Sequence, residues 1–243
     1  MTVCCTRPTD MKFAIFDLDH TLLPVDSGDG WSRWLVREAG LNAEQLDAQI
    51  QAYADAYHQG AFDVDAFMGF QMGLLAQCRR SDLEVWRHVF VEQKIRPYVP
   101  EVAVKLVKDR QQAGFVPVLA SGTHQFVTRA IAPLFGIDHV VGACPEENEA
   151  GEFTGRVVGS HSYQDGKRIL VEAFLRQQCE GLDDGTLELE AYSDSINDVP
   201  LLRFAAQHGR AFAVNPDSQL RSEALKQGWQ IMDIFKKVRA QDV

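Results

Sequence analysis

The sequence of 243 residues has little cysteine, little positive charge and no long apolar run, and these shortages exclude several classes of protein. Its five cysteines are odd in number and show neither a CxxC pair nor the spacing of a disulfide framework, which favours reduced thiols. They are Cys4, Cys5, Cys78, Cys144 and Cys179. No run of about 18 apolar residues is present, and residues 1–10 lack the apolar segment of a signal peptide. We therefore expect a cytoplasmic protein without a membrane partner.

Basic residues are fewer than acidic residues and are scattered along the chain. The chain has 24 Lys and Arg against 34 Asp and Glu, a formal net charge of -10, and its basic residues form no cluster. Such a chain repels nucleic-acid backbones and acidic lipid surfaces. The 46% of hydrophobic residues and the scattered Gly and Pro are typical of a globular protein. We expect an enzyme or binding protein, monomeric or homodimeric, that does not bind nucleic acid.

Five short apolar runs bounded by polar residues are typical of strands buried on both faces of a sheet. They cover residues 12–17, 115–121, 139–144, 187–193 and 211–215. Helical patterns separate or follow the last four runs, at 123–135, 164–179, 195–206 and 216–227. This alternation predicts an α/β fold with a doubly wound, Rossmann-like parallel sheet.

The residues between the first two runs break the alternation, because they contain almost no strand signal. They are typical of four helices, at 27–40, 43–60, 63–78 and 81–94. We expect a helical cap domain of residues 25–95 inserted after the first strand, a core domain of residues 11–24 and 96–243, and an N-terminal extension of residues 1–10. In the return segment 96–100, two prolines are expected to break the last helix and to force extended backbone.

Two groups of polar residues follow predicted strands. Asp17, Asp19 and Thr21 stand in DLDHTLL after the first strand, and Asp194, Asn197 and Asp198 stand in SDSIND after the fourth. Open parallel sheets gather ligands at the carboxyl ends of their strands, and both groups meet there if these two strands are neighbours. Grouped carboxylates favour a hard cation such as Mg²⁺. The alternatives are an acidic turn for the first group and a helix N-terminal cap for the second.

A phosphate cradle is indicated at the second strand. Ser121, Gly122 and Thr123 end this strand and open a helix, whose N-terminus favours an anion. A plain turn with a capping residue is the alternative. Lys167, near the start of another helix, could neutralise phosphate charge, although surface lysines are usually only solvated.

In this order, the four segments resemble the motifs of the haloacid dehalogenase superfamily: DxDxT, a Ser or Thr after the second strand, a Lys, and an acidic DxxxD. The match spans Phe13 to Pro200, and the insertion resembles the helical cap of the subfamily that contains phosphoserine phosphatases. The resemblance implies Mg²⁺-dependent hydrolysis of a small phosphorylated metabolite through a transient aspartyl-phosphate. A phosphomutase or phosphotransferase of the same fold, and a non-catalytic phosphometabolite-binding module, are the alternatives.

The resemblance also implies a role for each motif residue. The catalytic residues would be Asp17 as nucleophile, Asp19 as general acid and base, and Lys167 on the transferring phosphoryl group. Substrate binding would involve Thr21, Ser121, Gly122, Asn197 and Asp26. The metal would be held by Asp17, the Asp19 backbone carbonyl and Asp194, with Asp198 supporting the site. His20, His124 and His161 neighbour these motifs and receive no role.

The cap differs from that of the phosphoserine phosphatases. Those enzymes carry a Glu nine residues after the nucleophile, where this chain has Asp26. They also carry an Arg that helps to hold the substrate carboxylate, and Gly69 stands at the matching position. This difference from the family pattern favours a substrate other than phosphoserine, such as a phosphorylated amino alcohol like histidinol phosphate. The alternative is that another arginine, namely Arg33, Arg37, Arg79 or Arg80, holds the substrate carboxylate from a different direction. Phe67, Met68, Phe70 and Met72 either pack the cap or form a pocket wall for a less polar leaving group.

Overall fold

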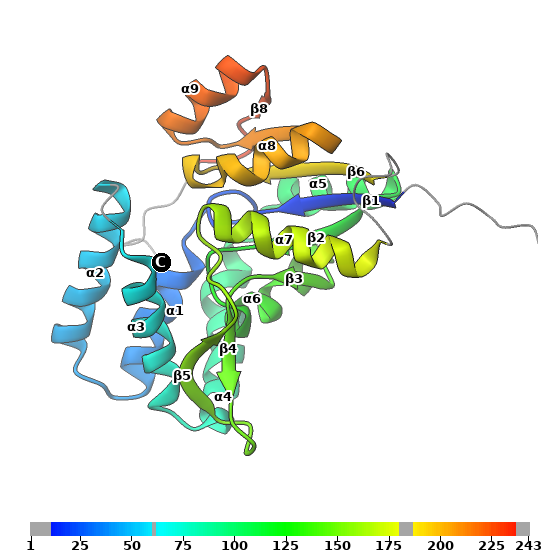
Figure 1. The fold of residues 1–243 in the computed structure, drawn as a ribbon. Coiled ribbons are helices and arrows are strands. Elements are labelled where there is room, and N and C mark those ends of the chain that lie inside the picture. Colours follow the sequence, from blue (N-terminus) through cyan, green and yellow to red (C-terminus); the bar gives the residue numbers. More distant parts are fainter. Residues whose placement is uncertain (1–10, 60–61, 180–186, 237–243) are drawn as a thin grey trace, which may run out of the picture.

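The computed structural model describes residues 11–59, 62–179 and 187–236 (Figure 1). Its central sheet is parallel and has six strands in the order β3-β2-β1-β6-β7-β8. These strands are β1 (Met11–Phe16), β2 (Val116–Ala120), β3 (His139–Val141), β6 (Leu187–Ser193), β7 (Gly209–Val214) and β8 (Gln230–Met232). The chain winds outward from β1 in both directions, so the predicted doubly wound α/β fold is confirmed.

Helices cover both faces of this sheet because successive side chains of a buried strand point to opposite sides. In β1, Phe13 and Ile15 belong to one apolar cluster, whereas Ala14 and Phe16 belong to the other. The helices of the α/β part are α5 (Glu101–Gln112), α6 (Gln125–Ile131), α7 (Asp165–Gln178), α8 (Val199–His208) and α9 (Ser218–Gln227). Core residues of α7, α8 and α9 lie in the cluster of Phe13, and those of α5 and α6 lie in the other. Neither α5 nor β8 was predicted from the sequence.

Four helices follow β1, as predicted, and lie together beside the sheet (Figure 1). They are α1 (Ser27–Glu38), α2 (Ala43–Gln59), α3 (Val64–Ala76) and α4 (Arg80–Phe90), and we call them the cap helices. Aspartate side chains cap two of them, because Asp26 accepts a 2.7 Å hydrogen bond from the Asp29 amide and Asp63 a 3.0 Å bond from that of Ala66.

The prediction of one strand over 139–144 was wrong. Strand β3 ends at Val141, and β4 (Cys144–Glu147) pairs antiparallel with β5 (Phe153–Val158) in a separate hairpin that the sequence analysis missed. Gly142 marks the break, where an added Cβ would lie 3.1 Å from the Ser121 carbonyl oxygen. The hairpin contacts the cap, because a Cβ added at Gly155 would lie 3.4 Å from Ala76 Cβ on α3.

The return segment was also only partly predicted. After α4, Val91–Ile95 forms a π-helical turn and Arg96–Tyr98 a 3₁₀ turn. Extended backbone is confined to Val99 and Pro100. Pro97 lies at the start of the 3₁₀ turn, where its missing N–H costs no hydrogen bond, so it did not end the helical path.

Across the three described ranges, the helices are all too short or too polar to cross a lipid bilayer. Cys78 and Cys144 carry free thiols, and the Cys179 sulfur lies 3.5 Å from the Met11 sulfur. Cys4, Cys5 and the rest of the predicted extension, residues 1–10, lie outside the described residues.

Candidate active site

The parallel pairing of β1 with β6 brings the two acidic segments together. The Asp17 amide donates a 2.9 Å hydrogen bond to the Tyr192 carbonyl, which extends the ladder to the strand ends. Thr21 Oγ1 lies 3.1 Å from Asp17 Oδ2 and 3.4 Å from Asp194 Oδ1. One buried hydroxyl therefore links a carboxylate after β1 to a carboxylate after β6.

Lys167 joins the same cluster from the first turn of α7. Its Nζ lies 2.9 Å from Asp17 Oδ1 and 2.7 Å from Asp198 Oδ2, which also accepts a 2.6 Å hydrogen bond from Ser193. Burial by itself disfavours the charged amine, but Asp17 and Asp198 outweigh it and raise the pKa of Lys167. Lys167 is thus a buried ammonium group, only 4% exposed, so it is no solvated surface lysine.

A glycine makes this position of α7 possible. A Cβ added at Gly166 would lie 2.5 Å from the His161 carbonyl oxygen, closer than nonbonded atoms approach. Only glycine allows the helix to begin this near to the preceding loop. The residue before Lys167 therefore helps to set where the ammonium group lies.

Asp17 and Asp19 lie in different environments. Burial raises the pKa of Asp17, and the adjacent Lys167 opposes that rise. Asp19 is held by neutral donors, the Ser27 amide at 2.7 Å and the Thr123 hydroxyl at 2.9 Å. Burial, followed by the charges of Asp26 and Asp17, raises the pKa of Asp19 well above its ordinary value. The two environments therefore differ, because an ammonium group lies beside Asp17 whereas neutral donors hold Asp19, and a difference of this kind separates a nucleophile from a general acid.

The predicted phosphate cradle is built from a hydroxyl and open backbone. Ser121 is 1% exposed, its Oγ accepts a 3.1 Å hydrogen bond from the Thr123 amide, and its carbonyl accepts a 2.7 Å bond from Ser162. Gly122 is exposed, and a Cβ added there would meet no atom within 4 Å. Helix α6 begins only at Gln125 and has seven residues, so the helix dipole is a smaller contributor than the sequence suggested.

Asn197 and Asp26 reach the site from opposite sides. Asn197 precedes Asp198 in a 3₁₀ turn, and its Oδ1 accepts 3.2 Å hydrogen bonds from Tyr163 and Gln164. Asp26 is the N-cap of α1, and its charge acts on Asp19. Both predicted substrate-binding side chains are half-buried and hydrogen-bonded to protein groups.

Several supporting residues were missed by the sequence analysis. Thr123 was noted only as part of the predicted phosphate cradle, yet its hydroxyl holds Asp19. Asn215, after β7, donates a 3.2 Å hydrogen bond to the carbonyl of His20, whose φ of 61° is unusual for a residue with a side chain. Asn215 itself has a φ of 45°. The sequence signal that could have identified Asn215 is a polar residue directly after a buried apolar run. Backbone in the left-handed region, as at His20 and Asn215, concentrates at functional sites.

The first turn of the cap rests directly on the site. A Cβ added at Gly28 would lie 2.8 Å from Thr123 Oγ1, so α1 reaches the cradle only because residue 28 is glycine. The neighbouring Ser27 donates its amide to Asp19. The first turn of α1 and the loop after β1 are therefore in contact at Asp19.

The donors at this edge fit a magnesium ion. Asp17, Asp194 and Asp198 are buried, Asp19 is half-buried, and Lys167 is the cation in contact with this group. Among the described residues, no three His, Cys, Asp or Glu side chains converge as a ready metal cage. Mg²⁺ needs none, because it is usually held by one or two carboxylates and keeps several waters. The two carboxylates that Thr21 links suit that requirement, and an excess of buried negative charge favours a cation.

His124 is buried beside the cradle without a polar partner. It is 2% exposed, and neither ring nitrogen has a hydrogen-bond partner in the described part of the chain. Burial, with the charge of Arg87 on α4 second, lowers the pKa of His124 from 6.5 to about 3. The folded protein therefore keeps this imidazole neutral, whereas the unfolded chain binds a proton below pH 6.5. The stability that it contributes is complete above that pH and is lost as the pH falls toward 3.

We expect His124 to make the protein sensitive to mild acid. Between pH 7 and pH 5, this residue alone should lower the free energy of unfolding by about 2 kcal/mol. The free energy of unfolding of His124→Phe should therefore fall by about 2 kcal/mol less than that of the wild type over the same interval. Urea unfolding at both pH values measures the difference. His88→Phe, at an exposed position of α4, is the matched control. Equal acid losses in His124→Phe and the wild type would contradict the prediction.

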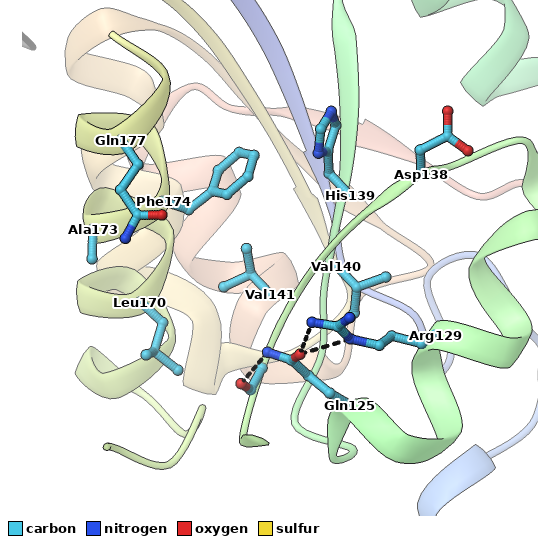
Figure 2. A pocket seen from close by; sticks show the side chains of 11 residues that line it. Gln125, Arg129, Asp138, His139, Val140, Val141, Leu170, Ala173, Phe174 and Gln177 are labelled. Carbon is cyan, nitrogen blue, oxygen red and sulfur yellow. Dashed lines mark hydrogen bonds between the residues drawn. The ribbon is translucent and has the colours of Figure 1, made fainter. Parts of the chain in front are cut away.

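A separate cavity lies at the outer edge of β3, between α6 and α7 (Figure 2). Its volume is about 430 Å³, and none of the residues predicted to act in catalysis lines it. Polar groups on its wall satisfy one another, because Gln125 bonds both the Arg129 guanidinium and the Gly142 carbonyl. The carboxylates grouped at the carboxyl ends of β1 and β6 lie outside this cavity.

Comparisons with known proteins agree with this geometry. A family model described as haloacid dehalogenase-like hydrolase matches residues 14–203. A histidinol-phosphatase of Neisseria meningitidis serogroup C is 33% identical over 222 residues, 91% of this chain and 98% of that protein. A phosphoserine phosphatase of Mycobacterium tuberculosis is 30% identical over 236 residues, 93% of this chain and 72% of that one. A structure of a protein with unknown function from Bordetella pertussis Tohama I superposes with a TM-score of 0.85 and 36% identity, covering 93% of this chain and all of that one. The chain therefore belongs to the haloacid dehalogenase-like hydrolase family, in which it is phosphoserine phosphatase-like.

Proposed function

We propose that this protein is a Mg²⁺-dependent phosphomonoester hydrolase that works through an aspartyl-phosphate on Asp17. The observation that carries the proposal is the buried Lys167 ammonium, 2.9 Å from one oxygen of Asp17 and 2.7 Å from Asp198. Phosphoryl transfer needs an in-line nucleophile and neutralisation of the phosphoryl oxygens, and these groups supply both. Mg²⁺, held by Asp17, Asp194 and the Asp19 carbonyl, would supply further neutralisation of phosphoryl charge.

In the first step, a carboxylate oxygen of Asp17 forms a bond to phosphorus while the bond from phosphorus to the ester oxygen breaks. Asp19 gives its proton to the leaving oxygen, so an alcohol departs and Asp19 becomes a carboxylate. The raised pKa of Asp19 supports its role as the proton donor. Ser121 and Lys167 hold the phosphoryl oxygens during the transfer.

In the second step, Asp19 takes a proton from a water molecule as the water oxygen attacks phosphorus. The bond from phosphorus to the Asp17 oxygen then breaks, which releases inorganic phosphate and restores both carboxyl groups. Thr21 holds the Asp17 carboxylate at 3.1 Å throughout. Asp198 keeps Lys167 in place, with Ser193 fixing Asp198 in turn.

The cap supports a leaving group without a carboxylate. Gly69 is exposed, and a Cβ there would meet no atom within 4 Å, so no neighbour replaces the missing arginine at that point. Two of the cap arginines that could replace it are engaged in ion pairs, Arg33 with Asp29 and Asp47 and Arg80 with Glu84 and Glu147. Arg37 and Arg79 are exposed on the cap surface. Three aspartates, Asp26, Asp29 and Asp47, surround Arg33 near the start of α1. This local excess of negative charge favours a cationic leaving group. We propose a phosphorylated amino alcohol as substrate, with histidinol phosphate the first compound to test; the similar Neisseria meningitidis protein bears that activity in its name.

Phosphoserine is the competing substrate, and it can be tested against a matched compound. O-phosphoethanolamine differs from phosphoserine only by lacking the carboxylate. A buried carboxylate without a charged partner is costly, so kcat/KM should be at least about tenfold higher for phosphoethanolamine. The measurement is inorganic phosphate release from both compounds and from histidinol phosphate, with Mg²⁺ present. Phosphoserine as the best of the three substrates would show that the cap has been misinterpreted.

The same assay separates hydrolysis from the phosphomutase and phosphotransferase alternative. A hydrolase releases one inorganic phosphate for each alcohol formed, whereas a mutase returns an isomeric phosphate ester. A non-catalytic binding module would do neither. The hydrogen-bonded Asp17 and Asp19 favour catalysis over binding alone.

A further inference from the structure

An aromatic contact joins the cap to the core beside the phosphoryl site. Phe62, in the segment that leads into α3, and Tyr163, in the loop that leads into α7, have ring centroids 5.1 Å apart and planes tilted by 59°. Both side chains are half-buried, so part of each ring faces solvent. The mechanism above uses neither ring.

Tyr163 is fixed relative to the reacting groups. Its hydroxyl donates a 3.2 Å hydrogen bond to Asn197 Oδ1, and Asn197 directly precedes Asp198, the partner of Lys167. Gln164 reaches the same amide oxygen at 3.2 Å and has a φ of 51°, a strained value for a residue with a side chain. The Tyr163 ring therefore occupies a defined place at the edge of the phosphoryl site.

Phe62 continues this contact into a row of rings within the cap. Its centroid lies 5.1 Å from Phe67, whose ring contacts Tyr53 at 5.3 Å, and Tyr53 contacts Phe70 at 5.4 Å. All of these aromatic side chains are half-buried. Met68 and Met72, by contrast, are 6% and 1% exposed and pack the cap interior. Of the residues considered as a pocket wall from sequence, the phenylalanines keep accessible surface and the methionines do not.

We propose that Phe62 and Tyr163 form the wall against which the leaving group binds, and that they select phosphomonoesters whose leaving group carries a flat ring. The inference rests on the proposed phosphatase function and names the substrate class of that site. Rings pair favourably in offset or edge-to-face geometry, beyond the area they bury. Each of the two residues keeps accessible ring surface, Phe62 on the cap side and Tyr163 on the core side of their contact. They act as specificity-determining residues, because the reacting atoms do not involve them.

Two substrates that differ only by a phenyl ring test the inference, namely the phosphate esters of phenylalaninol and alaninol. The quantity to measure is the ratio of their kcat/KM values. Losing one ring of the wall, in Phe62→Ala or Tyr163→Ala, should lower that ratio by about tenfold. Tyr163→Phe keeps the ring and loses only the hydroxyl, so the ratio should remain within about twofold of the wild type. Phe204→Ala is the matched control, since Phe204 is a half-buried ring on α8 that contacts His208.

The outcomes are distinguishable. A ratio that stays unchanged in both alanine variants, or that falls equally in Phe204→Ala, would overturn the inference while leaving the phosphatase function intact. Wild-type protein that releases phosphate from neither ester nor from any other monoester would instead refute the proposed function. Should Phe62→Ala not fold, the same ratio is measured for Phe62→Leu, because leucine keeps the apolar bulk without a flat ring. The ratio is expected to fall in that variant as well. Competitive inhibition by inorganic phosphate shows whether each variant retains its phosphoryl site.

Discussion

Asp17→Asn is expected to reduce kcat at least about a thousandfold, with the fold retained. Asparagine matches aspartate in shape but cannot provide the anionic oxygen that attacks phosphorus. The substitution also removes one of the two carboxylates that hold the Lys167 ammonium, while Asp198 keeps its 2.7 Å contact. The variant should therefore remain folded and should still bind inorganic phosphate.

Phosphate release measures the first part of this prediction, and circular dichroism with calorimetric phosphate binding measures the second. Asp109→Asn is the matched control, because Asp109 forms an exposed ion pair with Lys105 on α5. Its kcat should stay at the wild-type value. Should Asp17→Asn turn over substrate at near wild-type rate, Asp17 is not the nucleophile and the aspartyl-phosphate route fails.

Removal of divalent metal is expected to abolish phosphate release, and added Mg²⁺ to restore it. The physical reason is the gathering of buried carboxylates around the Lys167 ammonium group at this edge of the sheet, to which a phosphate dianion adds further negative charge. The measurement is phosphate release in excess chelator and after addition of Mg²⁺ beyond the chelator concentration. Full activity in excess chelator would contradict the metal assignment.

Thermal unfolding provides a readout of metal binding that does not depend on turnover. A ligand that binds only the folded state raises the unfolding midpoint with its concentration. Mg²⁺ should raise the midpoint of the wild type, and it should do so less for Asp194→Asn, which removes one proposed ligand. Asp217→Asn is an informative comparison, because Asp217 caps α9 and bonds the Ile196 amide close by without entering the metal group.

Much of the fold follows from local patterns in the sequence. The buried runs of β1, β2, β6 and β7 were predicted to within a few residues, because an apolar run between polar ends identifies a buried strand locally. The cap helices were found for the same reason, since their periodicity spans many turns. The hairpin β4–β5 and the short β8 were missed because they have few residues and their burial depends on distant partners. The 3₁₀ turn at Pro97 was missed because proline is tolerated in a first turn.

The candidate site divides in the same way. Local sequence fixes which residue types stand after which strands, and hence the chemistry they can perform: Asp17 and Asp19 after β1, Ser121 after β2 and Asp194 after β6. The sequence also shows that glycine, Gly69, stands where the phosphoserine phosphatases carry an arginine. These are local facts, because a strand end and its motif are adjacent along the chain.

The charge states and the partners of these groups, by contrast, depend on how the chain folds. Lys167 lies 150 positions from Asp17 in the chain, and its ammonium form depends on burial and on two carboxylates that folding places beside it. The unequal environments of Asp17 and Asp19, the Thr123 hydroxyl on Asp19 and the contact of Phe62 with Tyr163 arise in the same manner. A pKa or a ring contact depends on distance in space and on exclusion of water, and neither quantity can be obtained from the order of residues alone.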